Sequence, residues 1–576
     1  TKLDIAGIVL NNISLNYTDA QTNTRAQVSQ LNLNTGAIKS GQPVEIDSSL
    51  HLLMPDTGLD IDISTAVLAS NLLSGNGLKM DVSDFDITGK LSTESTLPLQ
   101  IQLQEQGQID LANDSLSFSD ISISAGAANI STNISGKNIQ HNMQLTGSYQ
   151  LSAFDLNALV KKLTGTDIVT SGVLSDFSSS GSWSFSGKQL KLNDLLVNFD
   201  DTTVKGSANI SNLDKMAGNF NLHINNLNVD DFLGDADSSQ ASSNSTSSDG
   251  SDIKFGHLTG TIKIDTLVAS GAKMDNISVQ VKTNNSKMSL APVKADFYKG
   301  LLVTEVQIDT KAQTNKVKVL HKMNKIHAGP LLTDVAGSEM LTGIGDLDID
   351  LKIDKPFSEL PLKSAHGKIK YQLDDGAIYG IDVFGMMKKG LGLIYPDLKQ
   401  KVDDGVKKTD FALMLIDADM DQGILTTNTL KIESPYLKVT GDVVIDLVNM
   451  TIDGSIEPML LDIPEELLSD NYKKLLNLPI PVGLSGSLLE PDISIDAKKL
   501  LLSSQKERIN KEKDKLKDKL MGSLFGKDKK ESNAEENSDK QDQVDDSEQS
   551  DEKQEPKKKE SKEDKLKKKL KGLFGG

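Results

Sequence analysis

Hydrophobic residues recur at every second position along most of this chain. The alternation is clearest in residues 59–64, 98–104, 116–124 and 220–225, where the positions between hold Ser, Thr, Asn, Gln or Asp. Such alternation gives a β-strand one apolar face and one polar face. Clusters of Gly, Asn and Asp separate the runs at short spacing, as turns do. Because strands buried on both faces would be continuously apolar, the pattern predicts a mainly β protein built as an antiparallel meander.

The same pattern resumes in the second half of the chain, from about Ile253. The most regular part lies between Leu341 and Asp496. Within it, residues 369–383 hold an alternating strand followed by an Asp-Asp-Gly-Ala turn, and residues 478–496 predict a closing strand pair. The functional question is therefore what the apolar face of this series of strands contacts.

Four segments depart from alternation and favour helices. They are residues 153–163, 330–341, 383–400 and 458–479, the last with loop character. In the second of these, Pro330 stands where a helix readily begins. We expect the first two helices to lie across an edge or end of a sheet, where they would cover unpaired strand groups.

Composition divides the chain into four regions. Residues 1–233 and 252–500 are predicted to be β-rich, and the Ser-rich residues 234–251 between them to be a flexible linker or loop. Residues 501–576 form a charged, low-complexity tail, expected to be disordered or transiently helical. The tail carries two near-copies of a Lys/Leu segment that ends in Leu-Phe-Gly, and its candidate membrane-contact residues are Leu520, Leu524, Phe525, Leu570, Leu573 and Phe574. The alternative is a solvated tail.

The overall composition excludes several classes of protein. Hydrophobic residues make up 37% of the chain and aromatic residues 4%, with Trp183 the one tryptophan, which favours a thin, repetitive β architecture. Cysteine is absent, so disulfides, thiolate nucleophiles and Cys-bound metals are excluded. A net charge of −19 argues against a nucleic-acid partner. Acidic and basic residues nearly cancel beyond about Ser503, so this negative charge belongs to the β-rich part.

No stretch of the sequence is long and apolar enough to predict a transmembrane helix. The chain begins at Thr1, without an initiator Met and already inside a strand-like pattern. We therefore expect a processed or truncated start, with any signal peptide or membrane anchor upstream.

A row of acidic residues, Asp346, Asp348, Asp350 and Asp354, resembles a calcium ligand set at first sight. These residues alternate with apolar ones, however, so a strand would place neighbouring carboxylates about 7 Å apart on its polar face instead of around one ion. The seven His residues show no zinc-binding spacing, and no nucleophile or nucleotide-binding motif is present. The sequence predicts no enzyme activity, no metal and no cofactor.

The apolar faces themselves allow two interpretations. Two sheets, or a sheet and its helices, would close over each other as an ordinary core. Alternatively, a curved and partly open sheet would hold acyl chains on its apolar face. The residue pattern alone leaves both open.

The most regular part of the chain resembles the C-terminal region of the AsmA family of Gram-negative envelope proteins. The matching motifs are residues 341–351, 374–383, 411–447 and 480–496 and the Lys-rich tail ending in Leu-Phe-Gly, with weaker similarity at 228–233 and 8–19. The order and spacing of these motifs carry the resemblance, because each motif alone is degenerate.

The resemblance implies a periplasmic protein anchored in the inner membrane by an N-terminal helix, which would lie upstream of Thr1. It implies an elongated, curved antiparallel β-groove, taco-like in section and with short capping helices, that moves phospholipids between the inner and outer membranes and supports outer-membrane biogenesis. The family has no catalytic residues. The implied groove positions are Leu347, Ile349, Leu351, Ile353, Ile369, Tyr371 and Leu373.

Phospholipid acyl chains, the inner membrane and outer-membrane assembly proteins are the expected partners. One rival interpretation is a structural factor for the assembly of outer-membrane proteins, with a closed dry core. A surface adhesin or β-solenoid is the third, and would show a tighter repeat than this chain does.

Overall fold

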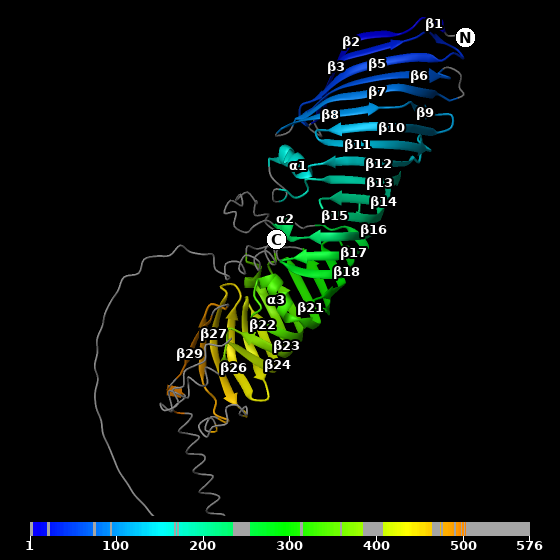
Figure 1. Ribbon diagram of the computed structural model, residues 1–576. Coiled ribbons are helices and arrows are strands. Elements are labelled where there is room, and N and C mark those ends of the chain that lie inside the picture. Colours follow the sequence, from blue (N-terminus) through cyan, green and yellow to red (C-terminus); the bar gives the residue numbers. More distant parts are fainter. Residues whose placement is uncertain are drawn as a thin grey trace, which may run out of the picture. The chain divides into compact units, whose positions relative to one another are not determined.

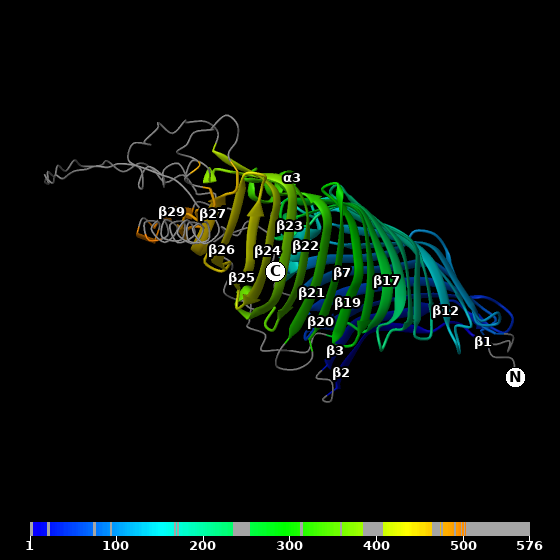
Figure 2. The same cartoon turned by 90° about the horizontal axis from the view of Figure 1, so that it is seen from below.

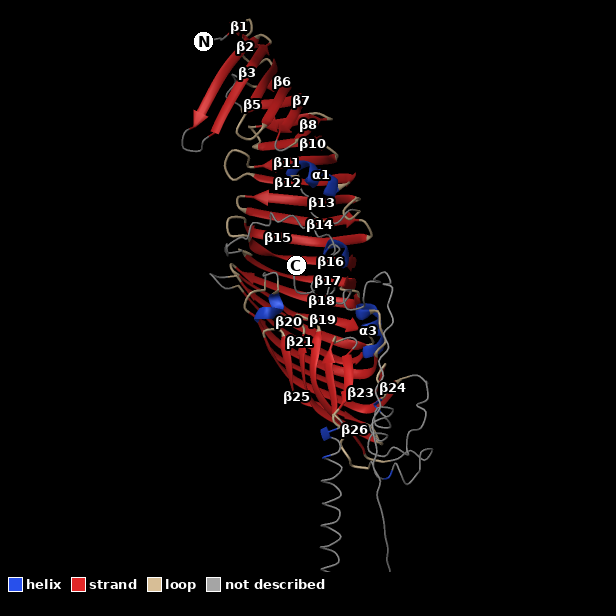
Figure 3. Ribbon diagram, turned by 90° about the vertical axis from the view of Figure 1, so that its left-hand side faces the viewer, coloured by secondary structure: helices blue, strands red, loops and turns tan. Residues whose placement is uncertain are grey.

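The computed structural model describes residues 4–502, except 20–23, 73–76, 93–94, 166–168, 170–171, 234–253, 311–314, 357–359, 384–406, 463–472, 474–475, 489–490, 497 and 500–501. The chain divides into two compact units. The first holds the described residues up to Val335 together with Asp346–Lys368, and the second holds Ala336–Gly345 and the described residues from Ile369 onward. Strands dominate both units (Figure 3), which confirms the predicted mainly β class.

The strands of the first unit lie side by side in chain order as one curved sheet (Figures 1 and 2). A continuous ladder runs from β2 to β21, and a separate short pair joins β1 to β4. The strands are β1 (Asp4–Ile5), β2 (Val9–Asp19), β3 (Thr24–Thr35), β4 (Ile38–Lys39), β5 (Val44–Met54), β6 (Leu59–Ser70), β7 (Lys79–Ser92), β8 (Thr96–Leu103), β9 (Gly107–Asp110), β10 (Ser115–Ala125), β11 (Ala128–Lys137), β12 (Gln144–Phe154), β13 (Phe177–Ser186), β14 (Gln189–Phe199), β15 (Thr202–Asn212), β16 (Ala217–Asn228), β17 (His257–Ala269), β18 (Ala272–Asn284), β19 (Lys287–Phe297), β20 (Gly300–Asp309) and β21 (Lys316–His327).

One pairing corrects the predicted meander: β16 and β17 are parallel, whereas the other strand pairings described in this unit are antiparallel. A parallel pair needs a connection that returns to the starting end of the sheet, which takes a dozen or more residues. The 28 residues between Asn228 and His257 provide that length. They include the Ser-rich segment, which the sequence identified as a linker but not as a crossover.

The helices of the first unit follow one long edge of its sheet (Figure 1). They are α1 (Leu156–Thr164) after β12, α2 (Asp230–Leu233) after β16 and α3 (Ala328–Ala336) after β21, α3 ending one residue past the unit boundary. Antiparallel strands end at alternate edges, so β12 and β16 finish at the same one. The parallel step at β17 shifts this alternation by one strand, which brings the end of β21 to that edge as well. We call this edge the helix rim and the opposite edge the hairpin rim.

The first helix is closed by its own sequence at both ends. The Asp155 carboxylate accepts a hydrogen bond from the Ala158 amide at 2.7 Å, as an N-cap does. Gly165 follows the last turn with φ 74°, and its amide donates to the Lys161 carbonyl. The prediction for 153–163 is thus confirmed from Leu156 onward, while its first residues belong to β12. The prediction for 330–341 is confirmed with a shift, because α3 starts at Ala328 and ends at Ala336.

The second unit is a smaller antiparallel sheet. Its strands are β24 (Lys408–Asp421), β25 (Ile424–Glu433), β26 (Leu437–Asp446), β27 (Thr451–Leu460), β28 (Val482–Gly486) and β29 (Pro491–Ile495), paired in chain order. Strands β22 (Leu341–Ile353) and β23 (Ala365–Tyr379) contribute residues to both units, and a short 3-10 turn, η1 (Pro361–Ser364), precedes β23. The predicted helix at 383–400 and most of the one at 458–479 lie outside the described residues, and residues 458–460 are the end of β27.

Among the described residues, no helix has the length and hydropathy needed to cross a membrane.

Candidate functional site

The strand register of the first unit aligns apolar side chains into rows that cross many strands. One row runs from β12 to β17 through Leu151, Ser179, Val197, Val204, Ile224 and Ile264, each paired with the next. A parallel row runs through Leu145, Phe185, Leu190, Ile210, Gly218 and Leu258. Since every second residue of a strand shares a face, these rows form a continuous apolar face perpendicular to the strands. We call it the apolar face.

Much of the apolar face is not covered by other parts of the described structure. Between Pro98 and Lys263, no described hydrophobic side chain is fully buried. The apolar residues of β10 to β16 are instead half-buried, as the unbroken intermediate exposure of β13 from Phe177 to Phe185 illustrates. An ordinary sandwich or helix-covered sheet would bury these positions. The structure therefore holds an apolar face that stays accessible over seven consecutive strands.

Large side chains on this face lie flat against glycines of neighbouring strands. Trp183 pairs with Gly147, and a Cβ on that glycine would lie 2.9 Å from the indole ring. Phe220 and Gly260 repeat the arrangement, with the ring 2.6 Å from the position of such a Cβ. The absent Cβ leaves room for the ring to lie along the sheet instead of standing up from it. The glycines thus allow the largest aromatic rings of the apolar face to lie close to the sheet.

Polar groups on the apolar face are paired with one another. The Tyr149 hydroxyl and the Ser179 hydroxyl lie 3.0 Å apart. Further along, the Thr304 hydroxyl lies 2.7 Å from Nδ1 of His321, and burial lowers the pKa of His321. A neutral imidazole is compatible with an apolar surface, whereas an imidazolium would be costly there. These groups therefore interrupt the face without placing a charge on it.

Toward β17–β21 the apolar face becomes covered. Ile264, Ile277, Phe297 and Leu302 are buried there, and Leu331 of α3 packs against this cluster. Two polar contacts to Asp334 also hold the helix in place. The Tyr298 hydroxyl donates to the Asp334 carboxylate at 2.7 Å, and the Lys273 ammonium lies 3.3 Å from it. Burial raises the pKa of Tyr298 to about 12. The open part of the face therefore ends where α3 begins to cover it.

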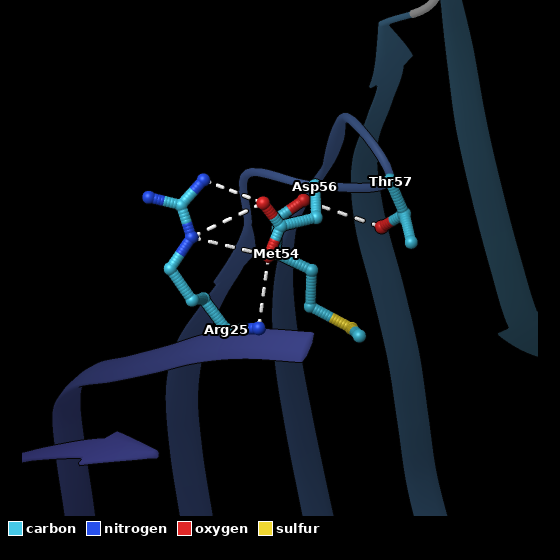
Figure 4. Close-up of polar contacts among 4 residues, drawn as sticks. All are labelled: Arg25, Met54, Asp56 and Thr57. Carbon is cyan, nitrogen blue, oxygen red and sulfur yellow. Dashed lines mark hydrogen bonds and ion pairs between the residues drawn. The ribbon is translucent and has the colours of Figure 1, made fainter. Parts of the chain in front are cut away.

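The opposite end of the first sheet is stabilised by an ion pair near its edge strand (Figure 4). The Arg25 guanidinium contacts the Asp56 carboxylate at 2.5 Å, and the Arg25 amide donates to the same carboxylate at 2.9 Å. Thr57 donates to the Met54 carbonyl in the same turn. The pair joins the start of β3 to the turn between β5 and β6. Beyond β3, the hydrophobic residues of β2 are exposed, Val9 by 61% and Leu15 by 57%.

The second unit has a closed core. Leu373, Val439, Leu460 and Ile480 are each 0% exposed, and Val482 is 1% exposed. Leu373 packs beside Gly343 and Gly345, close enough that a Cβ on either glycine would meet its side chain. This burial leaves no accessible apolar face at these positions.

The seven groove positions implied by the resemblance all lie on apolar sides of their strands, but their exposure differs. Leu347, Ile349, Ile369 and Tyr371 are half-buried, while Leu351 and Ile353 are 6% exposed and Leu373 is fully buried. Burial raises the pKa of Tyr371 to about 12. Contact of these seven with lipid stays a prediction. The six candidates in the tail lie outside the described residues.

The acidic row behaves as the alternation predicts. Asp346, Asp348 and Asp350 are exposed and alternate with the apolar positions of β22. Asp348 and Asp354 pair with Lys322 and Lys316 of β21, at 3.9 and 3.7 Å. Within the described ranges, no group of three His, Asp or Glu residues could hold a metal ion. Asp348 and Asp354 therefore have lysine partners across the strand pair.

Sequence reasoning did not single out residues 116–224 as an accessible apolar face. The alternation was identified there only at residues 116–124 and 220–225. The available signal was the combination of alternating Leu, Ile and Phe with glycines on the apolar side, such as Gly147 and Gly206. Glycine at an apolar position of a strand indicates close packing against a neighbour, but which neighbour depends on register.

Most of the chain is similar to known proteins. The model of the AsmA family matches residues 1–430. The protein AsmA of Escherichia coli (strain K12) is 20% identical to this chain over 530 residues, which cover 87% of this chain and 81% of that protein.

Proposed function

This chain belongs to the AsmA family, and on that premise we propose that it is a non-enzymatic protein that carries lipid acyl chains along the open apolar face of β10–β16. The family is one of envelope proteins, so the chain's function is related to the cell envelope. The identity and route of the cargo are the proposal.

One observation supports the proposal above the others: seven consecutive strands present half-buried apolar side chains with no described layer packed over them. Moving a lipid out of a bilayer exposes its tails, at about 0.8 kcal/mol for each methylene. An apolar face that runs across many strands offsets this cost at each step along its length. A closed core could not do so, because its apolar area is already buried.

The chemistry of the face suits a tail and not a headgroup. Its polar members, such as Tyr149 with Ser179 and Thr304 with His321, are engaged with each other. A charged headgroup placed among them would lose its hydration without gaining an ionic partner. The headgroup would therefore remain at the edge of the sheet, in water, while the tails lie across the rows.

In the envelope this activity would move phospholipids between the inner and outer membranes through the periplasm and support outer-membrane biogenesis. The protein would be held at the inner membrane by an N-terminal anchor. Similarity to AsmA of E. coli supports this placement.

The closed core of the second unit supports a second proposal. The part of this unit that the structure describes buries Leu373, Val439 and Ile480 completely, so these positions offer no apolar surface to lipid and the role of the unit would be structural. It would present a stable surface to proteins that assemble in the outer membrane.

The lipid proposal is tested with a matched pair of variants on β16. Leu222→Asp places a carboxylate on the apolar face, and Asn221→Asp places one on the polar face of the same strand, one residue away. Native mass spectrometry of the purified proteins would report bound phospholipid, and transfer of a fluorescent phospholipid between vesicles would report activity. We expect Leu222→Asp to lose both and Asn221→Asp to keep both, with circular dichroism confirming that each is folded. A folded Leu222→Asp protein with undiminished lipid and transfer would refute the proposal.

A further inference from the structure

On the polar face of the first unit, β21 and β22 carry a ladder of opposite charges. Lys316 pairs with Asp354, and Lys322 pairs with Asp348. Because the two strands run antiparallel, the position two residues after Lys316 on β21 faces the position two residues before Asp354. Lys318 therefore lies opposite Lys352. The second pair gives the same register, since two further steps from Lys318 and Lys352 lead through Leu320 and Asp350 to Lys322 and Asp348.

The Lys318–Lys352 position breaks the complementarity of this ladder. Directly opposed side chains have Cβ atoms about 5 Å apart, and like charges in that position destabilise a sheet. Neither ammonium group has a carboxylate partner among the described residues. In a protein with a net charge of −19, in which Asp occupies most neighbouring positions of β22, two facing lysines form a local excess of positive charge.

These two lysines also line a cavity of about 500 Å³ at the hairpin rim. The cavity takes three consecutive residues from each of five strand ends: 282–284, 287–289, 307–309, 316–318 and 352–354. The middle residue of each set belongs to the apolar side of its strand, and the outer two belong to the polar side. The side chains on the polar side therefore form two parallel rows, one on each side of the middle residues.

The row that holds Lys318 and Lys352 continues through Gln307 and Ser289 to Lys282, each paired with the next from β21 to β18. It contains three cations, an amide and a hydroxyl, and no carboxylate. The other row contains the cavity's two carboxylates, and each is already engaged: Asp309 lies 3.2 Å from Lys287, and Asp354 lies 3.7 Å from Lys316. Ammonium, amide and hydroxyl groups are all donors to an anion.

A second cavity, at the helix rim, provides a contrast within the same unit. It has a volume of about 470 Å³ and is lined by Asp200, Asp201 and Asp231 with no lysine or arginine. Such a lining repels an anion. The excess of donors is thus a property of the hairpin-rim cavity and not of cavities in this protein generally.

We propose that the cavity at the hairpin rim binds a phosphate group, held between Lys318 and Lys352 and contacted by the Gln307 amide. The bound anion would relieve the repulsion between the two lysines by supplying a negative charge, as Asp348 supplies one to Lys322. Phosphate in this position would be a monoester or diester on a larger molecule, either a lipid headgroup or a soluble phosphate ester. Lys318, Lys352 and Gln307 belong to the polar side of the sheet, so phosphate binding by them would not depend on lipid tails occupying the apolar face.

Thermal unfolding and isothermal titration with inorganic phosphate, at fixed ionic strength against chloride, test the site directly. We expect phosphate to raise the Tm of the wild-type protein, and Lys318→Gln with Lys352→Gln to weaken phosphate binding at least tenfold. Lys322→Gln is the matched control, because it removes one cation from the same strand but outside the cavity. We expect it to bind phosphate as the wild type does.

Lys352→Asp separates binding from folding. It would complete the charge ladder, so we expect a higher Tm in chloride together with loss of the phosphate effect. Sedimentation with vesicles of phosphatidylglycerol or of phosphatidylcholine then identifies the source of the phosphate. Binding to phosphatidylglycerol vesicles that is lost in the double variant supports a lipid headgroup, and binding of the free ion alone supports a soluble ester. Equal phosphate effects in wild type and double variant, or an equal loss in Lys322→Gln, would overturn the site, whatever the outcome for lipid transfer.

Discussion

The indole of Trp183 lies across Gly147 on the neighbouring strand, in space that a Cβ on this glycine would enter at 2.9 Å. The chain has no other tryptophan. Its one indole therefore sits in a half-buried row of the apolar face, between Gly147 of β12 and Leu192 of β14. This position makes Trp183 an intrinsic reporter of whatever covers that face.

The first prediction uses this reporter. Phospholipids with brominated acyl chains should quench the Trp183 fluorescence, because bromine atoms in the tails would come into contact with the indole. Lipids brominated in the headgroup should quench it much less, since the headgroup stays at the edge of the sheet. Measurement of emission intensity against lipid concentration checks both. Equal quenching by the two lipids would contradict tail binding at this row.

Strand β22 illustrates which features of the sheet the sequence predicted. Alternation correctly assigned Leu347 and Ile349 to one face and Asp348 to the other, because the two-residue period of a strand is local. Alternation could not tell how well each apolar side chain is covered. Coverage depends on packing between segments distant in the chain, as between Leu331 of α3 and the strands before it. For that reason the pattern left both the closed core and the open face possible.

The same limit applies to strand direction. The parallel pairing of β16 with β17 follows from where the connecting segment returns to the sheet, which no periodicity records. The register that sets Trp183 on Gly147, or Lys318 opposite Lys352, likewise arises between strands. The mainly β class and the two faces of the clearly alternating strands were therefore predictable, whereas the accessible area and the rim cavity required the assembled sheet.

A second prediction distinguishes the closed core from the open face. Leu373→Ala should destabilise the second unit by about 2–5 kcal/mol, because its side chain is fully buried and its removal leaves a cavity. Leu222→Ala in the first unit should cost less, since Leu222 is only half-buried. Urea unfolding followed by hydrogen exchange, which reports each unit separately, checks the difference. We expect bound lipid to be unchanged in Leu373→Ala, and a cost of Leu222→Ala as large as that of Leu373→Ala would show that the face is covered.

The third prediction concerns the dependence of the apolar face on pH. Burial lowers the pKa of His321 below its usual value near 6.5, so the folded protein favours the neutral ring. The unfolded chain then binds a proton more readily, and stability contributed by the neutral ring is present above about pH 6.5 and is lost as pH falls through the lowered pKa. Titration of the His321 ring by NMR should place its pKa below the usual value near 6.5. His321→Gln should reduce the acid sensitivity of the region around β20 and β21, and an unchanged sensitivity would assign it to other groups.

The fourth prediction concerns the ion pair at the far end of the first sheet. The Arg25 guanidinium, through its hydrogen bonds, lowers the pKa of the Asp56 carboxyl, and the Arg25 amide also donates to that carboxylate. The pair should therefore hold the start of β3 to the turn between β5 and β6 at neutral pH and remain formed below the usual carboxyl pKa. The stabilisation is lost as pH falls through the lowered pKa of Asp56, because protonation removes the charge that Arg25 contacts.

Asp56→Asn should therefore increase hydrogen exchange of the Arg25 amide and of the β2–β3 pairing at pH 7, with little change in the rest of the first unit. Both groups of the pair are at the surface, so the effect should be local and should diminish in high salt. Asp47→Asn, which removes an exposed carboxylate from β5, serves as the control and should leave this exchange unchanged. If the two variants exchanged alike, the stability of the edge would have to come from the strand pairing of β2 with β3 and not from the ion pair.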